Sequence, residues 1–113
     1  MKRRIVEKPW GFEHIWAETD DYVAKMLHIN PNQRLSLQYH EKKEETVYVL
    51  EGTLLNWTDD DKSPPQRHNT NQVLHIEPNK IHRFGAGNSM VRLMEVSTPH
   101  LDDVVRLADD YDR

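Results

Sequence analysis

The sequence contains no cysteine. This absence excludes disulfide bonds, thiol nucleophiles, iron–sulfur clusters and zinc sites with cysteine ligands. Any metal site must therefore use histidine, carboxylate or amide ligands. The absence also fits a cytoplasmic protein, and we expect that location.

Long hydrophobic runs and an excess of positive charge are missing as well. No run of about 18 apolar residues is present, and the basic N-terminal residues lead into polar sequence rather than the apolar core of a signal peptide. Lys and Arg total 15 against 19 Asp and Glu, which gives a formal net charge of -4. Because the basic residues are also scattered, the sequence lacks the electrostatic footprint of a nucleic-acid-binding protein. We expect a mature soluble protein that contacts neither membranes nor nucleic acid, although a few local cations can still hold an anionic ligand.

The pattern of short apolar runs predicts one all-β domain over residues 1–113. Runs rich in β-branched and aromatic residues recur at regular spacing and are separated by turn residues, as in a barrel or sandwich. The expected strands are 12–17, 23–29, 35–40, 46–50, 54–57, 73–76, 81–84 and 91–96. The polar stretch 59–71 carries two adjacent prolines and predicts a surface loop.

The C-terminal residues follow a different period. Leu101, Val104, Val105 and Ala108 are spaced by three and four, with acidic residues near the start of the segment. This spacing predicts a short helical segment packed on the barrel.

Potential metal ligands concentrate between residues 35 and 52. In a strand, residues two apart share a face, so Gln38 and His40 point the same way. A tight turn of charged residues leads to Glu45 at the head of the next strand, and His82 begins a later apolar strand. If these strands are neighbours in one barrel, an amide oxygen, a carboxylate and two imidazoles meet at its mouth, which suits a divalent transition metal. The other histidines are expected to be ordinary surface or hydrogen-bonding residues: His14, His28, His68, His75 and His100.

These residues and their spacing resemble the cupin family. The first cupin motif has a ligand pair separated by one residue, a Glu about five residues on and a Gly seven after that. Gln38, His40, Glu45 and Gly52 match this motif, and His82 matches the second motif, a histidine after a proline-containing turn. The resemblance implies a double-stranded β-helix, or jelly-roll, barrel with one divalent metal held by Gln38, His40, Glu45 and His82.

Two turns depart from the cupin pattern in an informative way. Asn71 and Asn79 stand where that pattern prefers glycine. Asparagine is the non-glycine residue best able to adopt left-handed backbone geometry. We therefore expect both turns to keep the conformation that glycine would provide.

Within the cupins, nearly the full chain resembles the type II phosphomannose isomerase domain. The matching segments are, in order, 8–11, Lys25, 35–40, 95–98, 102–107 and 110–113. That domain often follows a mannose-1-phosphate guanylyltransferase domain, so the resemblance implies only the isomerase half. Val47, Lys43 and Asp112 stand where the family usually has Trp, Arg and Gly.

The resemblance implies that mannose 6-phosphate and fructose 6-phosphate are interconverted through an enediol, with a proton moved between C2 and C1. A bound metal would stabilise the negative charge that develops on the substrate oxygens. Arg106, in the tail segment that resembles the family's functional arginine, is the first candidate for holding the phosphate, followed by Lys25 and Lys8. The proton-transfer base stays open between Glu13, His28 and a metal-bound hydroxide.

The ligand set leaves the identity of the metal open. We favour zinc, with manganese, iron, nickel and cobalt open, because all accept nitrogen and oxygen ligands.

The composition favours a dimer. The hydrophobic residues amount to 36%, so a barrel with so few apolar residues gains from covering one face with a second copy, and we expect a homodimer.

Two other functions are alternatives to the isomerase. The departures at Val47 and Asp112 leave room for a cupin that binds a sugar or sugar phosphate without turnover. An iron-dependent dioxygenase with the same ligands is the third alternative.

Overall fold

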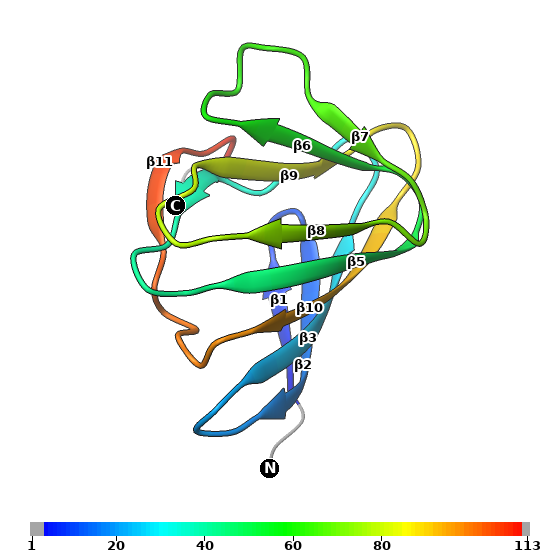
Figure 1. The fold of residues 1–113 in the computed structure, drawn as a ribbon. Helices are drawn as coiled ribbons and strands as arrows, with labels where there is room; N and C mark the ends of the chain where they lie inside the picture. Colours follow the sequence, from blue (N-terminus) through cyan, green and yellow to red (C-terminus); the bar gives the residue numbers. More distant parts are fainter. Residues whose placement is uncertain (1–3, 112–113) are drawn as a thin grey trace.

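Residues 4–111, which a computed structural model describes, form two antiparallel β-sheets (Figure 1). The larger sheet has the strand order β1-β2-β3-β10-β5-β8, and the smaller one has the order β11-β4-β9-β6-β7. Their strands are β1 (Arg4–Lys8), β2 (Gly11–Glu18), β3 (Val23–Ile29), β4 (Leu37–Tyr39), β5 (Glu45–Glu51), β6 (Leu54–Thr58), β7 (Gln66–His68), β8 (Val73–Ile76), β9 (His82–Ala86), β10 (Val91–Ser97) and β11 (Val105–Ala108). This is the all-β, two-sheet, cupin-like arrangement that the sequence predicted.

All the predicted strands are found, with ends displaced by no more than one or two residues. Their alternating patterns reflect the structure directly, because successive side chains point to opposite faces of a sheet. Along β10, for example, Val91, Leu93, Glu95 and Ser97 are buried, while Arg92 and Val96 between them are exposed.

The predicted C-terminal helical segment is wrong. Residues 105–108 form β11, and no part of residues 4–111 is helical, so these residues offer no helix that could cross a membrane. The acidic residue expected near the helix start, Asp103, instead accepts hydrogen bonds from the backbone N–H groups of residues 41–43. This tether holds the segment extended beside β4, where Arg106 pairs with Gln38.

Two further strands were missed because they lie in polar sequence. β1 is at one edge of the larger sheet, and β7, inside the stretch expected to be a loop, is at one edge of the smaller sheet. An edge strand pairs on one side only and can be short, so it leaves a weak apolar pattern in the sequence.

The turn prediction is confirmed at both asparagines. Asn71 has φ +75° and Asn79 has φ +67°. The N–H of Asn79 donates to the carbonyl oxygen of His40 at 2.6 Å, so this turn ties the start of β9 to the end of β4. Gly52 has φ +84°, and a Cβ there would lie 2.4 Å from the carbonyl oxygen of Met90, which explains why this position requires glycine.

The hydrophobic core lies between the two sheets. Strands of the larger sheet contribute Val49 and Leu93, and strands of the smaller sheet contribute Leu54 and Phe84. The first three of these side chains are fully buried. The core therefore fastens the two sheets together and fixes the strand ends that carry the polar residues described next.

Candidate metal centre

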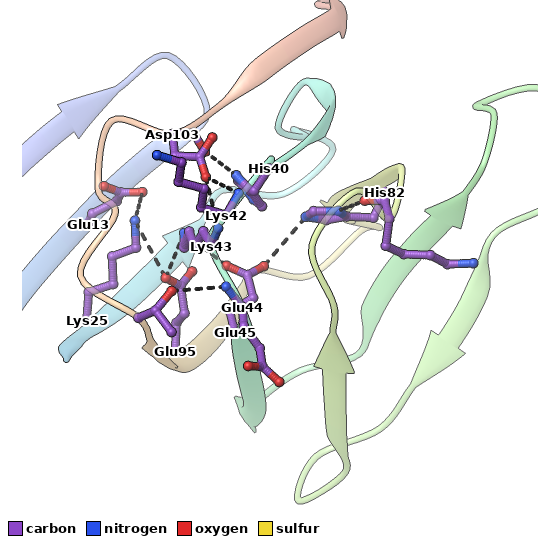
Figure 2. A network of polar contacts seen from close by, with 12 residues as sticks. Glu13, Lys25, His40, Lys42, Lys43, Glu44, Glu45, His82, Glu95 and Asp103 are labelled. Atoms are coloured by element: carbon purple, nitrogen blue, oxygen red, sulfur yellow. Dashed lines mark hydrogen bonds and ion pairs between the residues drawn. The ribbon is translucent and has the colours of Figure 1, made fainter. Parts of the chain in front are cut away.

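Three of the four predicted metal ligands, His40, Glu45 and His82, come together inside the barrel. Their side chains are 3%, 2% and 2% exposed. One ligand atom from each lies within 4.8 Å of the other two. Figure 2 shows both imidazoles close to the Glu45 carboxylate, with a dashed line joining His82 to it.

The topology explains why residues so far apart in sequence meet. His40 immediately follows β4, Glu45 begins β5 and His82 begins β9. β4 and β9 are neighbours in the smaller sheet, whereas β5 belongs to the larger one. The cluster therefore bridges the two sheets at one end of the barrel.

Backbone carbonyls orient both imidazoles. His40 Nδ1 lies 2.6 Å from the carbonyl oxygen of Asp103, and His82 Nδ1 lies 2.9 Å from that of Lys80. Since a carbonyl oxygen only accepts, each Nδ1 must carry the proton, which leaves each Nε2 as an acceptor. Both Nε2 atoms are buried and have no hydrogen-bond partner in the described residues. This is how histidine ligands are presented to a metal.

The protonation states also suit metal binding. Burial, reinforced by the nearby Lys43 charge, lowers the pKa of His40, so its imidazole is neutral near pH 7. Burial alone would raise the pKa of Glu45, but a proton shared with His82 Nε2 and the adjacent Lys43 ammonium outweigh that effect and hold the pKa well below its ordinary value. His82 Nε2 and Glu45 Oε1 are 3.5 Å apart. Two acceptors facing each other in this way are stable only when a proton or a metal ion lies between them.

The fourth predicted ligand, Gln38, lies on β4 directly across from His82. Its side-chain oxygen accepts a hydrogen bond from Ser36 Oγ at 2.7 Å. It lines a small cavity together with His40. Ligation by Gln38 stays a prediction.

A buried network of charges supports the cluster, and sequence reasoning missed most of it. Lys43 Nζ lies 2.9 Å from Glu45 Oε2 and 3.0 Å from Glu95 Oε2. Lys25 Nζ lies 3.0 Å from Glu13 Oε2 and 3.9 Å from the same Glu95 oxygen (Figure 2). Burial, reinforced by the Glu45 charge, raises the pKa of Glu95. The available signal was a charged residue at an inward position of an alternating strand, Glu95 in the middle of β10.

The cations predicted to hold a phosphate line the same small cavity, which has a volume of about 90 Å³. Arg106, Lys25 and Lys8 all contribute to its wall, as does Glu13. His28, the other side chain considered as a base, instead stacks on Phe12 with ring centroids 4.9 Å apart. The altered tail position, Asp112, lies outside the described residues.

A two-sheet antiparallel barrel with a buried His–Glu–His cluster at one end defines a protein of the cupin class. Solved structures support this fold. KdgF from Halomonas sp. is similar with a TM-score of 0.72 and 17% identity, covering 88% of each chain. A cupin-like protein from Thermotoga maritima is similar with a TM-score of 0.72 and 19% identity, covering 90% of this chain and 80% of that one.

The family model described as mannose-6-phosphate isomerase C-terminal matches residues 1–109, and the chain belongs to this family. Two curated relatives are both named mannose-1-phosphate guanylyltransferase. The protein from Sinorhizobium fredii is 30% identical over 107 residues, covering 91% of this chain and 20% of its own. The protein from Escherichia coli K12 is 32% identical over 114 residues, covering 97% and 23%. The chain thus spans about a fifth of the length of these relatives.

Proposed function

We propose that this cupin domain is a metal-dependent isomerase that interconverts mannose 6-phosphate and fructose 6-phosphate. One observation carries the proposal: His40, Glu45 and His82 form a buried donor set, and the adjoining cavity is lined by the cations Arg106 and Lys25. A sugar phosphate needs both, because its phosphate requires a cation and its developing enediolate requires positive charge. The family membership supports the same reaction.

The positions of the residues suggest a separate role for each in this reaction. A divalent cation held by the two imidazoles and the Glu45 carboxylate, with Gln38 as the proposed fourth ligand, supplies Lewis-acid polarisation of the substrate oxygens. Arg106 holds the phosphate, because its guanidinium offers a fork of donors that matches phosphate oxygens. Lys25 is paired with Glu13.

Among the side chains considered for proton transfer, Glu13 fits best. It lines the cavity, whereas His28 is stacked on Phe12. In the proposed mechanism Glu13 moves the proton between C2 and C1, and its ion pair with Lys25 orients the carboxylate.

The test is proton NMR of mannose 6-phosphate in D₂O with the protein stripped of metal and then reloaded with zinc, manganese, cobalt or nickel. The proposal predicts metal-dependent formation of fructose 6-phosphate with deuterium entering the carbon-bound positions. His40→Ala should abolish turnover, and Arg106→Ala should chiefly raise KM. Arg67→Ala, at an exposed arginine on β7, is the matched control and should convert substrate like the parent protein.

If the folded, metal-loaded protein shows neither conversion nor deuterium uptake with any of these metals, the isomerase proposal is wrong. Saturable binding of mannose 6-phosphate without turnover would then assign the domain as a sugar-phosphate-binding cupin. Oxygen consumption by the iron-loaded protein would instead favour a dioxygenase.

We also propose that the domain forms a homodimer through the outer face of its larger sheet. Four strands of that sheet expose large apolar side chains: Trp16 on β2, Val96 on β10, Tyr48 on β5 and Val73 on β8. Large apolar side chains exposed on one sheet favour burial against a partner. Sedimentation should give twice the 13.4 kDa mass of one chain. A mass of one chain at micromolar concentration would exclude the dimer.

A further inference from the structure

A second and larger cavity, of about 510 Å³, adjoins the candidate metal centre at His82. It is lined by residues of β6, β7 and β8 and of the turn before β9. β7 and β8 are edge strands of different sheets (Figure 1). His82 lines this cavity, whereas His40 lines the small one. Its volume falls within the range of about 300–1,000 Å³ that is usual for small-molecule sites.

The wall of this cavity contains buried polar atoms that no protein group satisfies. Asn56 lies on β6 two residues after the core residue Leu54 and therefore faces the barrel interior. It is 5% exposed, and its Oδ1 has no hydrogen-bond partner within residues 4–111. His68 Nε2, on β7, is likewise buried without a partner there. Because leaving a buried polar atom unpaired costs free energy, these atoms favour a ligand that supplies the missing hydrogen bonds.

The charges of the cavity wall indicate an uncharged ligand. Glu77 and Lys80 are its charged members and have opposite signs. Burial lowers the pKa of His68, which keeps that ring neutral near pH 7. The small cavity, by contrast, carries a net positive charge, because its lining includes Lys8, Lys25, Lys43 and Arg106 but only one carboxylate, Glu13.

The apolar part of the wall comes from β8, through the inward-facing Leu74 and Ile76, and it lies beside the polar residues Thr58, Gln66 and His75. The ligand must therefore present hydroxyl groups to the Asn56 side and a C–H face to the β8 side. A pyranose ring has both surfaces, since its hydroxyls project outward and its axial hydrogens form an apolar face.

We propose that the cavity between β6, β7 and β8 is a second ligand site that binds a neutral sugar ring, separately from the phosphate-binding cations. Asn56 and His68 hydrogen-bond the hydroxyls, and the β8 side chains pack against the ring. Binding here requires neither a metal nor a phosphate group. It is therefore testable whether or not the domain is an isomerase.

The experiment is a ¹H–¹⁵N NMR titration of the metal-free protein with methyl α-D-mannopyranoside up to about 50 mM, well above a weak Kd of roughly 1 mM. Saturable shifts are expected at the amides of residues 56, 68 and 74–76. Inorganic phosphate, the anionic probe, should leave these amides unchanged and shift those near Arg106. Asn56→Leu and His68→Leu should each weaken sugar binding about tenfold, equivalent to roughly 1.4 kcal/mol.

His28→Leu is the matched control, because it makes the same substitution on β3 where the ring stacks on Phe12. It should bind the sugar like the parent protein. The half-buried His68 position keeps the test valid if the spectrum of Asn56→Leu shows an unfolded chain. The proposal is overturned if no saturable shift occurs at the named amides, or if His68→Leu binds the sugar as tightly as the control does.

Discussion

The two ends of the barrel interior are built from the same strands but have opposite chemistry. On β10, the inward residues Val91 and Leu93 belong to the apolar core, whereas the next inward residues, Glu95 and Ser97, are polar. β9 shows the same change in the other direction, since His82 is followed at the next inward position by Phe84.

The pairing register of the strands extends this change from apolar to polar inward residues across the larger sheet. Leu93 pairs with Leu27 and Val49 on the strands beside it. Glu95, two residues further on, pairs with Lys25, and Ser97 pairs with Glu45. The rung at Leu93 is therefore entirely apolar, whereas the rungs at Glu95 and Ser97 add charged residues to the apolar Val47 and Val23.

The apolar layer and the charged layer of the barrel therefore serve different purposes. Buried apolar side chains stabilise the barrel, whereas buried charges cost free energy unless they are paired. A network that costs free energy to bury is more easily explained by the ligand that it holds than by the stability of the fold.

The largest effect is expected from weakening the apolar layer. Leu93→Ala should lower the free energy of unfolding by about 3–5 kcal/mol, because the fully buried side chain leaves a cavity. Urea denaturation measures the loss. Leu50→Ala, at a leucine that is 40% exposed, is the matched control and should change stability by no more than about 0.5 kcal/mol. Equal losses in the two variants would contradict the assigned layer.

In the polar layer, the test is to remove the carboxylate shared by two lysines. Glu95→Gln should cost about 3 kcal/mol, because it leaves the buried Lys43 and Lys25 charges with fewer counter-charges. Adding Lys43→Met should recover part of this loss, so that a double-mutant cycle measures a coupling between the pair. Strictly additive losses would show that the two charges do not interact.

A smaller effect is expected where the C-terminal segment supports the metal ligands. The Asp103 carboxylate accepts from the backbone N–H groups of residues 41–43, and its carbonyl orients His40. Asp103→Ala should therefore lower metal affinity about 10–100-fold, as measured by competition with a chelator. Asp102→Ala, at the exposed neighbouring aspartate, is the control. Unchanged affinity in Asp103→Ala would exclude this support.

The smallest effect concerns pH and lies outside both layers. Asp110 pairs with Arg34 at 2.6 Å and with Arg83 at 2.7 Å, and the hydrogen bond from Arg34 lowers the pKa of Asp110. A carboxyl with a depressed folded-state pKa stabilises fully above its unfolded pKa of about 3.9, and this contribution is lost as pH falls through the folded value.

Asp110→Asn should therefore lower stability by about 1 kcal/mol at pH 6. The difference between the variant and the parent protein should shrink below about pH 4, as measured by thermal unfolding over this pH range. A difference that stays constant down to pH 2 would contradict the ion pair as its cause.

The sequence predicted the interior strands and three clustered ligands because both depend on a period of two. The same alternation that buries Val47 and Val49 also places Glu45 on the inner face of β5. The helix predicted around residues 105–108 was wrong because apolar residues spaced by three and four also occur in strands. Here a distant contact, between Asp103 and the backbone of residues 41–43, holds the segment extended as β11.

The charge network could not be predicted because pairing depends on register. Lys25 and Glu95 are opposite each other only because β3 and β10 are neighbours, a fact that no local pattern contains. The larger cavity was missed for a related reason. In the sequence, Asn56 and His68 are ordinary polar residues, and only the pairing of β6 with β7 places them on one wall.

We expect the polar end of the barrel to hold one divalent metal through His40, Glu45 and His82. Equilibrium dialysis of the purified protein against zinc, followed by elemental analysis, tests it directly. One tightly held ion per chain is expected in the parent protein and none in a folded Glu45→Gln variant. Failure of the parent protein to retain zinc, or full retention by Glu45→Gln, would exclude this metal site.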